Sequence, residues 1–327
     1  LFALFNVFIL LIKVYQDSVI SILLQTEFIE NIFSLFNEPL PLEMKSISFD
    51  FLFQILNFNK KSIDQSTFYF DDLYQIVFNE INSIDIGEDV LIIHQFLKYI
   101  EMLICFQPQF ICSKDNEVSH LIDLIFQRQD LNLFFKSIID VIILLIDSCF
   151  DTFSPSLPCI PALTIILDNW ESENNLIYQS LNLRFIEKVA SHKFSFEIVS
   201  TSSFQKEPIL YQICHFVSQY WERSTTSEIM KLSLKTAHSL IDNYDESLPI
   251  FIDDQIIMHM ICIYNSDQPF EIKKLAGLII FHVIFLNFDV VCPDNFDDIH
   301  DIFNDLSDTN IICPEVIDVL QQRFDQL

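Results

Sequence analysis

Glycine is almost missing from this chain. Its 327 residues include only two glycines, Gly87 and Gly277. Dinucleotide-binding fingerprints, phosphate-binding loops and nucleophile elbows each require several glycines, for tight turns or for close approach of the backbone to phosphate. Their absence excludes the common nucleotide-binding folds and the glycine-flanked serine hydrolase site. Hairpins also depend on turn glycines, so the same scarcity argues against a fold built from β-strands.

Positive charge is the second shortage. Asp and Glu outnumber Lys and Arg by 46 to 18, which gives a formal net charge of −28. No basic run is longer than Lys60-Lys61 or Lys273-Lys274, so we expect no nucleic-acid partner. The acidic surplus has two interpretations, and both stay open. It keeps an apolar chain dispersed through mutual repulsion, or it forms an acidic groove that attracts basic peptides.

Paired cysteines and glycosylation sites are also missing. The eight cysteines are scattered without a CxxC pair, and no Asn-x-Ser/Thr acceptor occurs. This pattern favours reduced thiols over a disulfide framework. It predicts a cytoplasmic and/or nuclear protein.

Few residues have the spacing of a metal or catalytic site. His259 and Cys262 share a helix face at i, i+3, but no nearby residues complete a set of four zinc ligands. Cys214 and His215 are adjacent, so on a helix they point about 100° apart and cannot act as a dyad. The segment Asp242–Glu246 is similar to a calcium loop but lacks the central glycine. We therefore predict no enzyme activity, with no catalytic residues, no cofactor and no metal.

What the chain does contain is a repeat of about 43 residues. The segments Ile29–Leu56 and Ile257–Ile284 align without a gap, and in each a short polar turn leads to an acidic residue that opens an apolar helix. Self-similarity at this period is typical of helical solenoids. Such helix openings fall near residues 43, 88, 134, 174, 228, 271 and 315. They predict about seven units.

The apolar pattern within each unit is helical. Hydrophobic residues make up 51% of the chain, and they recur at i, i+3, i+4 and i+7, as in Ile257, Met260, Ile261 and Tyr264. We therefore predict an all-α fold, a single helical-repeat domain over residues 1–327. Linkers are expected at residues 113–119, 152–161 and 200–208, where the units meet.

The first apolar segment has two interpretations. Leu1–Ile12 is only 12 residues long before Lys13, whereas a membrane-spanning helix needs about 20, and no basic segment precedes it. The repeat predicts that residues 1–25 hold the second helix of a truncated preceding unit. A signal peptide or membrane anchor is the alternative. We predict no membrane partner.

The repeats resemble those of a known family. Asn265–Ile284, and less closely Ser227–Ile241, look like the turn and third helix of armadillo repeats, in which Glu-aliphatic-x-Lys precedes small residues such as Ala276 and Gly277. HEAT-type repeats are similar. The resemblance implies a right-handed superhelical solenoid whose third helices line a concave groove for extended peptides.

The importin-alpha branch of this family carries a Trp and, four residues later, an Asn on successive third helices. That ladder is absent here, since the aligned positions hold residues such as Lys235 with Ser239 and Leu278 with His282. The resemblance instead implies a polar groove. The residues expected to line it are Asp50, Gln54, Gln95, Tyr99, Ser239 and His282.

These observations predict a non-catalytic scaffold that binds a protein or peptide along the concave face of its helical repeats. The alternative is an importin-type nuclear transport adaptor that holds basic segments through its acidic surface. Screening by salt separates the two, because only an electrostatic interface weakens steeply with ionic strength.

Overall fold

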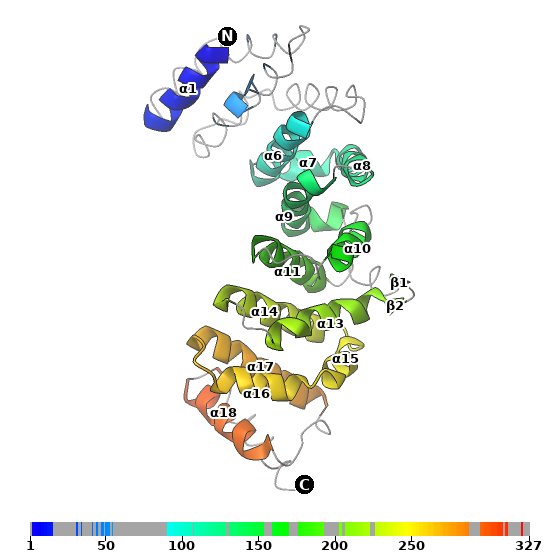
Figure 1. The fold of residues 1–327 in the computed structure, drawn as a ribbon, viewed down its shortest axis with the longest axis vertical. Helices are drawn as coiled ribbons and strands as arrows, with labels where there is room; N and C mark the ends of the chain where they lie inside the picture. The colour runs from blue at the N-terminus through cyan, green and yellow to red at the C-terminus, as the bar shows by residue number, and fades with distance from the viewer. Residues whose placement is uncertain are drawn as a thin grey trace. The chain divides into compact units, whose positions relative to one another are not determined.

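A computed structural model describes residues 2–15, 90–106, 108–128, 131–153, 159–169, 176–192, 203–204, 207–222, 226–287, 295–309 and 311–312, with isolated residues among 31–54 and Gln322. These residues are almost entirely helical, which confirms the predicted all-α class (Figure 1). The chain divides into two compact units, residues Leu1–Leu157 and Pro158–Leu327, where the sequence predicted one domain. The boundary falls inside the linker predicted at residues 152–161.

The helix bounds follow the predicted period. In the first unit the helices are α1 (Phe2–Tyr15), α6 (Val90–Phe106), α7 (Pro108–Cys112), α8 (Asp115–Phe126), the 3-10 turn η1 (Leu131–Leu133) and α9 (Phe135–Phe153). In the second unit they are α10 (Cys159–Asn169), α11 (Leu176–Ser191), α13 (Ile209–Glu222), α14 (Ser227–Asn243), α15 (Ser247–Asp253), α16 (Ile256–Asn265), α17 (Phe270–Leu286) and α18 (Phe296–Asp308). The openings predicted near residues 134, 228 and 271 are confirmed, because α9, α14 and α17 begin within one residue of them. Those predicted near 43, 88, 174 and 315 lie outside the described residues.

In the first unit, α9 is the central helix. It packs against α6, α7, α8 and η1. Its inward face consists of β-branched and leucine side chains with no exposure, such as Ile138, Ile142 and Ile146. The helix is kinked at Cys149, where the backbone leaves helical geometry (φ −138°, ψ 26°). The Cys149 thiol donates to the carbonyl of Pro108 at 3.5 Å, which ties α9 to the start of α7.

In the second unit, the helices form two rows. One row holds α10, α13 and α16, in which each helix packs on the next. The other row holds α11, α14 and α17, so that α14 lies between α11 and α17 (Figure 1). Contacts between α10 and α11, α13 and α14, and α16 and α17 join the rows. Both rows bury the apolar faces that the periodicity predicted, including Ile257, Met260 and Ile261 on α16.

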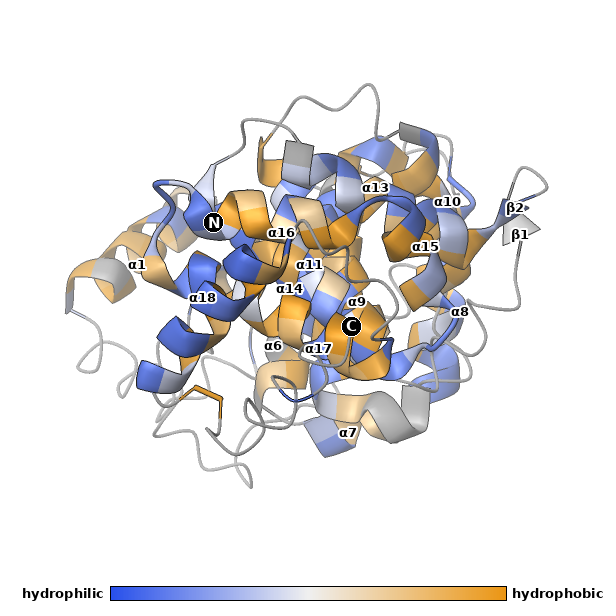
Figure 2. Cartoon of the chain, turned by 90° about the horizontal axis from the view of Figure 1, so that it is seen from below, coloured by the Kyte–Doolittle hydropathy of each residue, from blue (hydrophilic) through white to orange (hydrophobic). Residues whose placement is uncertain are grey.

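The sequence of α18 shows why these segments are helical. Its buried residues Ile299, Ile302, Phe303 and Leu306 stand at i, i+3, i+4 and i+7, while acidic residues occupy its first turn, where the helix dipole favours them. Figure 2 shows this mixture of hydrophilic and hydrophobic residues along the helix.

Gly277 allows α17 to approach its neighbours closely. A β-carbon at this position would lie 2.8 Å from Leu306 Cδ1 of α18 and 3.2 Å from Tyr264 Cε2 of α16. Ala276 beside it is fully buried. The small residues of the repeat therefore lie where helices pack tightly, as the sequence predicted.

Two local expectations need correction. The linker predicted at residues 113–119 is only a two-residue turn, because Asp115 already opens α8, with Asp115 and Glu117 in its first turn, where the helix dipole favours acidic residues. The chain also contains a short antiparallel pair of strands, β1 (Ser203–Phe204) and β2 (Glu207–Pro208), within the linker predicted at residues 200–208. The scarcity of glycine argued against a fold built from β-strands, but it did not exclude a strand pair of two residues on each side.

The segment Phe2–Tyr15 is helical, in agreement with the repeat interpretation, although its place within a repeat stays a prediction. Within the described ranges, no single helix is long and apolar enough to cross a membrane. The neighbouring helices α15 and α16 are bent by 69° relative to each other. Taken together, this pair has the length and apolar composition of a membrane span.

Candidate functional site

The clearest polar cluster in the described parts of the chain lies on α14 and α17. Thr226 caps α14 by accepting a hydrogen bond from the Ile229 amide at 3.4 Å, and Glu228 stands in the first turn. Pro269 and Glu271 open α17 in the same way as the repeat predicted. The buried stripes of both helices face the core, which leaves their charged residues and histidines partly or fully exposed.

Three contacts tie α14 to α17 along their length. Ser227 Oγ donates to Gln268 Oε1 at 3.2 Å just before α17 begins. One turn further along α14, the Lys231 ammonium group pairs with the Glu271 carboxylate. Near the end of α14, Asp242 pairs with His282 of α17 at 2.9 Å. Polar contacts therefore lie near both ends of the boundary between α14 and α17, which we call the α14–α17 seam.

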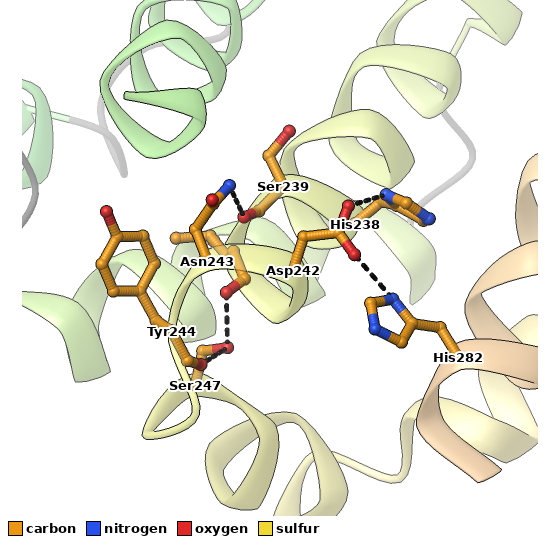
Figure 3. A network of polar contacts seen from close by, with 8 residues as sticks. His238, Ser239, Asp242, Asn243, Tyr244, Ser247 and His282 are labelled. Atoms are coloured by element: carbon orange, nitrogen blue, oxygen red, sulfur yellow. Dashed lines mark hydrogen bonds and ion pairs between the residues drawn. The ribbon is translucent and has the colours of Figure 1, made fainter. Parts of the chain in front are cut away.

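The Asp242 carboxylate is held by two imidazoles. His238, one turn earlier on α14, places its Nδ1 atom 2.9 Å from Asp242 Oδ2. His282 places its Nδ1 atom 2.9 Å from Asp242 Oδ1. Figure 3 shows both rings directed at the same carboxylate from two helices, and the ring centroids are 5.5 Å apart. We call these three residues the His–Asp–His cluster.

The cluster is half-buried. The side chains of His238, Asp242 and His282 are 33%, 42% and 23% exposed. Burial lowers the pKa of His282, the neighbouring His238 lowers it further, and Asp242 opposes both by raising it. The neutral form of His282 is therefore favoured, and a neutral imidazole can donate a hydrogen bond or bind a metal through its nitrogens.

Ser239 and Asn243 continue the polar surface at the end of α14. The Asn243 side-chain amide donates to the Ser239 carbonyl at 2.9 Å. Ser247 is buried and donates to the Leu240 and Tyr244 carbonyls, which closes the turn into α15 (Figure 3). These bonds satisfy the last carbonyls of α14 and hold Asp242 at a fixed place on the surface.

The predicted groove residues lie in different surroundings. Ser239 of α14 and His282 of α17 are both partly exposed, and His282 meets Asp242 of α14. Asp50 and Gln54 are also partly exposed, in the other unit. Tyr99 is only 4% exposed, so its side chain belongs to the core of the first unit, and we leave it out of any surface. The side chain of Gln95 lies outside the described residues.

Sequence reasoning missed His238 and Asp242. A signal was available, since they stand at i, i+4 on a predicted helix and so share one face. Asp242 was considered only as the start of a calcium loop, and the structure instead turns it toward the two histidines. His282 was predicted from its repeat position alone.

A second polar group surrounds a hollow of about 310 Å³ between α13, α15 and α16. Ser218 Oγ lies 2.7 Å from Asp254 Oδ2 and 3.0 Å from the His215 carbonyl. His215 Nδ1 is 3.6 Å from the same carboxylate. Gln255, at the mouth of the hollow, has a left-handed backbone (φ 58°).

This hollow lacks the order of contacts that nucleophilic catalysis requires. A serine nucleophile is activated by a hydrogen bond to an imidazole, which a carboxylate then orients. Here Ser218 instead bonds to the carboxylate of Asp254 and to the backbone carbonyl of His215. Cys214 is fully buried and its pKa is raised well above the ordinary thiol value by burial and by Asp254. Cys214 therefore faces the core while His215 is exposed, as the helix geometry predicted.

Comparison with known proteins gives no relative: no protein-family model matches the chain, and no curated protein matches it. The argument for function therefore depends on the site itself.

Proposed function

We propose that the chain is a divergent armadillo- or HEAT-type α-solenoid that acts as a non-catalytic scaffold and binds a protein segment along the surface of α14 and α17. The regular helix openings support the repeat. Further support comes from side-chain contacts that recur one repeat apart. Ser137 and His94 are 43 residues apart, Ser227 and Gln268 are 41 apart, and Tyr264 and Asp305 are 41 apart.

The observation that carries the binding surface is the contact of Asp242 on α14 with His282 on α17, with the partly exposed Ser239 three residues before Asp242. In an armadillo-type groove, an extended peptide is held by hydrogen bonds from polar side chains on successive third helices. By the repeat pattern α14 and α17 are such helices, and they are neighbours in one row. Ser239 supplies a hydroxyl group, His282 an imidazole and Asp242 a carboxylate, so the surface offers both donors and acceptors to a peptide backbone.

Charge favours partner segments that contain Lys or Arg. Asp242 is 42% exposed at the centre of the surface, and the whole chain carries a net charge of −28. Such a surface attracts basic segments over distances of about one Debye length, roughly 8–10 Å near physiological ionic strength. The importin-type adaptor is the form of this proposal in which charge supplies most of the affinity.

The test begins with capture of partners from a cell extract and continues with one purified partner. Partner affinity is measured at about 0.1 M and about 0.4 M salt for the wild-type chain and for Ser239→Ala and His282→Ala variants. We expect each variant to weaken binding by about tenfold, the effect of losing one to two hydrogen bonds, without lowering Tm. The matched control is His300→Ala, a 47% exposed histidine on α18.

Four outcomes discriminate among the possibilities. Weakening by the α14–α17 variants but not by the control supports the surface. Unchanged affinity in both variants removes it. A steep loss between the two salt concentrations selects the basic-segment adaptor, while salt-insensitive binding selects a hydrogen-bonded or apolar interface.

A further inference from the structure

We propose that the His–Asp–His cluster binds one divalent transition-metal ion, and zinc is the ion to test. Two imidazole nitrogens and one carboxylate meet between α14 and α17, and the donor atoms of His238, Asp242 and His282 all lie within 4.8 Å of one another. Within the described residues, this is the one group of histidine, cysteine and acidic side chains that meets this spacing.

The distances suit coordination after a small movement. Zinc lies about 2.0–2.2 Å from nitrogen and oxygen ligands, so neighbouring ligand atoms in a tetrahedral site are about 3.3 Å apart. Here each Nδ1 atom is 2.9 Å from an oxygen of Asp242. A metal ion would take the place of the two N–H···O contacts, and the side chains would move until the three donor atoms, which now lie within 4.8 Å of one another, are about 3.3 Å apart. All three are partly exposed and attached to helix surfaces, so they have room to do so.

The ligand set selects the class of metal. Two neutral imidazoles and a carboxylate suit zinc and its neighbours, whereas calcium and magnesium require a shell of oxygen atoms. Three protein ligands leave a fourth position, which water fills in an open zinc site. Because the ligands come from α14 and α17, the ion would also fasten one helix to the next in its row.

The other histidine–aspartate contact in the same unit is a matched control. His215 and Asp254 also come from two elements, but they are 3.6 Å apart, and within the described residues no third ligand joins them at the 4.8 Å spacing. One imidazole and one carboxylate do not make a site for a tightly held ion. The two places therefore differ in the number of converging ligands, while both contain a partly exposed histidine beside an aspartate.

The experiment is isothermal titration of the full chain, stripped with a chelator, with zinc chloride at neutral pH. We expect one zinc per chain. Replacing a direct ligand should weaken binding more than replacing an outer-sphere partner does, so His238→Gln and His282→Gln should each lower the affinity by at least about 100-fold. His215→Gln should bind zinc like the wild type, and magnesium chloride should give no saturable heat.

Thermal unfolding supplies an independent readout. Zinc that binds only the folded chain raises Tm, so the wild type and His215→Gln should shift upward and the two cluster variants should not. Two substitutions are used because one of them alone could disturb the fold, which Tm without zinc would reveal. Unchanged zinc affinity in both well-folded cluster variants would overturn the site. Loss of binding in Cys262→Ser, which removes an exposed thiol on α16, would do the same.

Discussion

The α6–α9 seam of the first unit and the α14–α17 seam of the second are built on the same repeat spacing but have different chemistry. In the first, His94 of α6 lies 5.0 Å from the ring of Phe134, and its Nδ1 atom is 3.4 Å from Ser137 Oγ of α9. In the second, His282 of α17 meets a carboxylate and a second histidine. Helix packing determines where the two seams lie, and the side chains at each seam determine whether the contact is structural or can bind a ligand.

Electrostatics separates the two seams further. The pKa of His94 is lowered by burial and by the nearby Lys98, and a backbone hydrogen bond with Leu133 raises it only in part. No carboxylate contributes to that shift, so the favoured form of His94 is neutral and packed on an aromatic ring. The α14–α17 seam instead combines carboxylates with histidines and a lysine at half-exposed positions. Among the described residues, only the second seam brings a carboxylate and two imidazoles together at its surface.

The largest expected effect is on the free energy of unfolding. Both seams lie over buried apolar side chains, which we call the apolar base of the seam. Ile138 of α9 and Leu234 of α14 are both fully buried. Replacing either with alanine removes buried methyl groups and leaves a cavity, so each variant should lose about 2–5 kcal/mol of unfolding free energy. Urea unfolding followed by circular dichroism measures this loss.

The exposed controls for that experiment are Leu133→Ala near α9 and Phe285→Ala on α17, whose side chains are 57% and 61% exposed. They should change stability by much less than the buried pair. Equal effects from buried and exposed positions in one unit would mean that the apolar base described for that seam is incorrect.

The next largest expected effect is the pH dependence of stability that His94 gives to the first seam. Because the folded chain lowers the pKa of His94 below its ordinary value of 6.5, the unfolded chain binds the proton more readily. Stability is therefore unaffected by this group above pH 6.5 and falls as the pH drops below it. The His94→Gln variant removes the titration, so it should lose less stability than the wild type between about pH 7 and pH 5.

The measurement is the urea midpoint across that pH range. Ser137→Ala is the matched control, since it removes the 3.4 Å contact but keeps the imidazole. It should retain the wild-type slope with pH. The same slope in His94→Gln as in the wild type would show that His94 is not the group that titrates.

The sequence predicted the helices well, for a physical reason. Helix openings depend on local signals, such as Thr226 before Glu228 and Pro269 before Glu271, and apolar periodicity follows from burial of one face. These signals lie within a few residues of one another, so they can be recognised in the sequence alone. The strand pair at residues 203–208 was missed because two residues of pairing leave no periodic trace.

The site was predicted only in part, because it depends on how side chains point. His282 and Ser239 were found from their repeat positions, but Tyr99, at an equivalent position, is buried. A repeat position specifies a place on a helix, and a shift in the packing of neighbouring helices decides whether that place faces solvent. Asp242 meets His282 across two helices, so no local spacing could reveal the contact.

The smallest expected effect concerns the residue that resembles the armadillo pattern most closely. Glu271 pairs with Lys231 across the α14–α17 seam, and the hydrogen bond and charge of Lys231 lower its pKa. Its side chain is 71% exposed, however, and exposed ion pairs are screened by water and salt. Glu271→Gln should therefore change Tm by no more than about 2 °C, as should Glu228→Gln at the equivalent position in the first turn of α14. Differential scanning calorimetry at low and high salt checks both. A much larger loss for Glu271→Gln alone would mean that the charged seam fastens α14 to α17 in addition to presenting a surface, and would place stability and binding on the same residues.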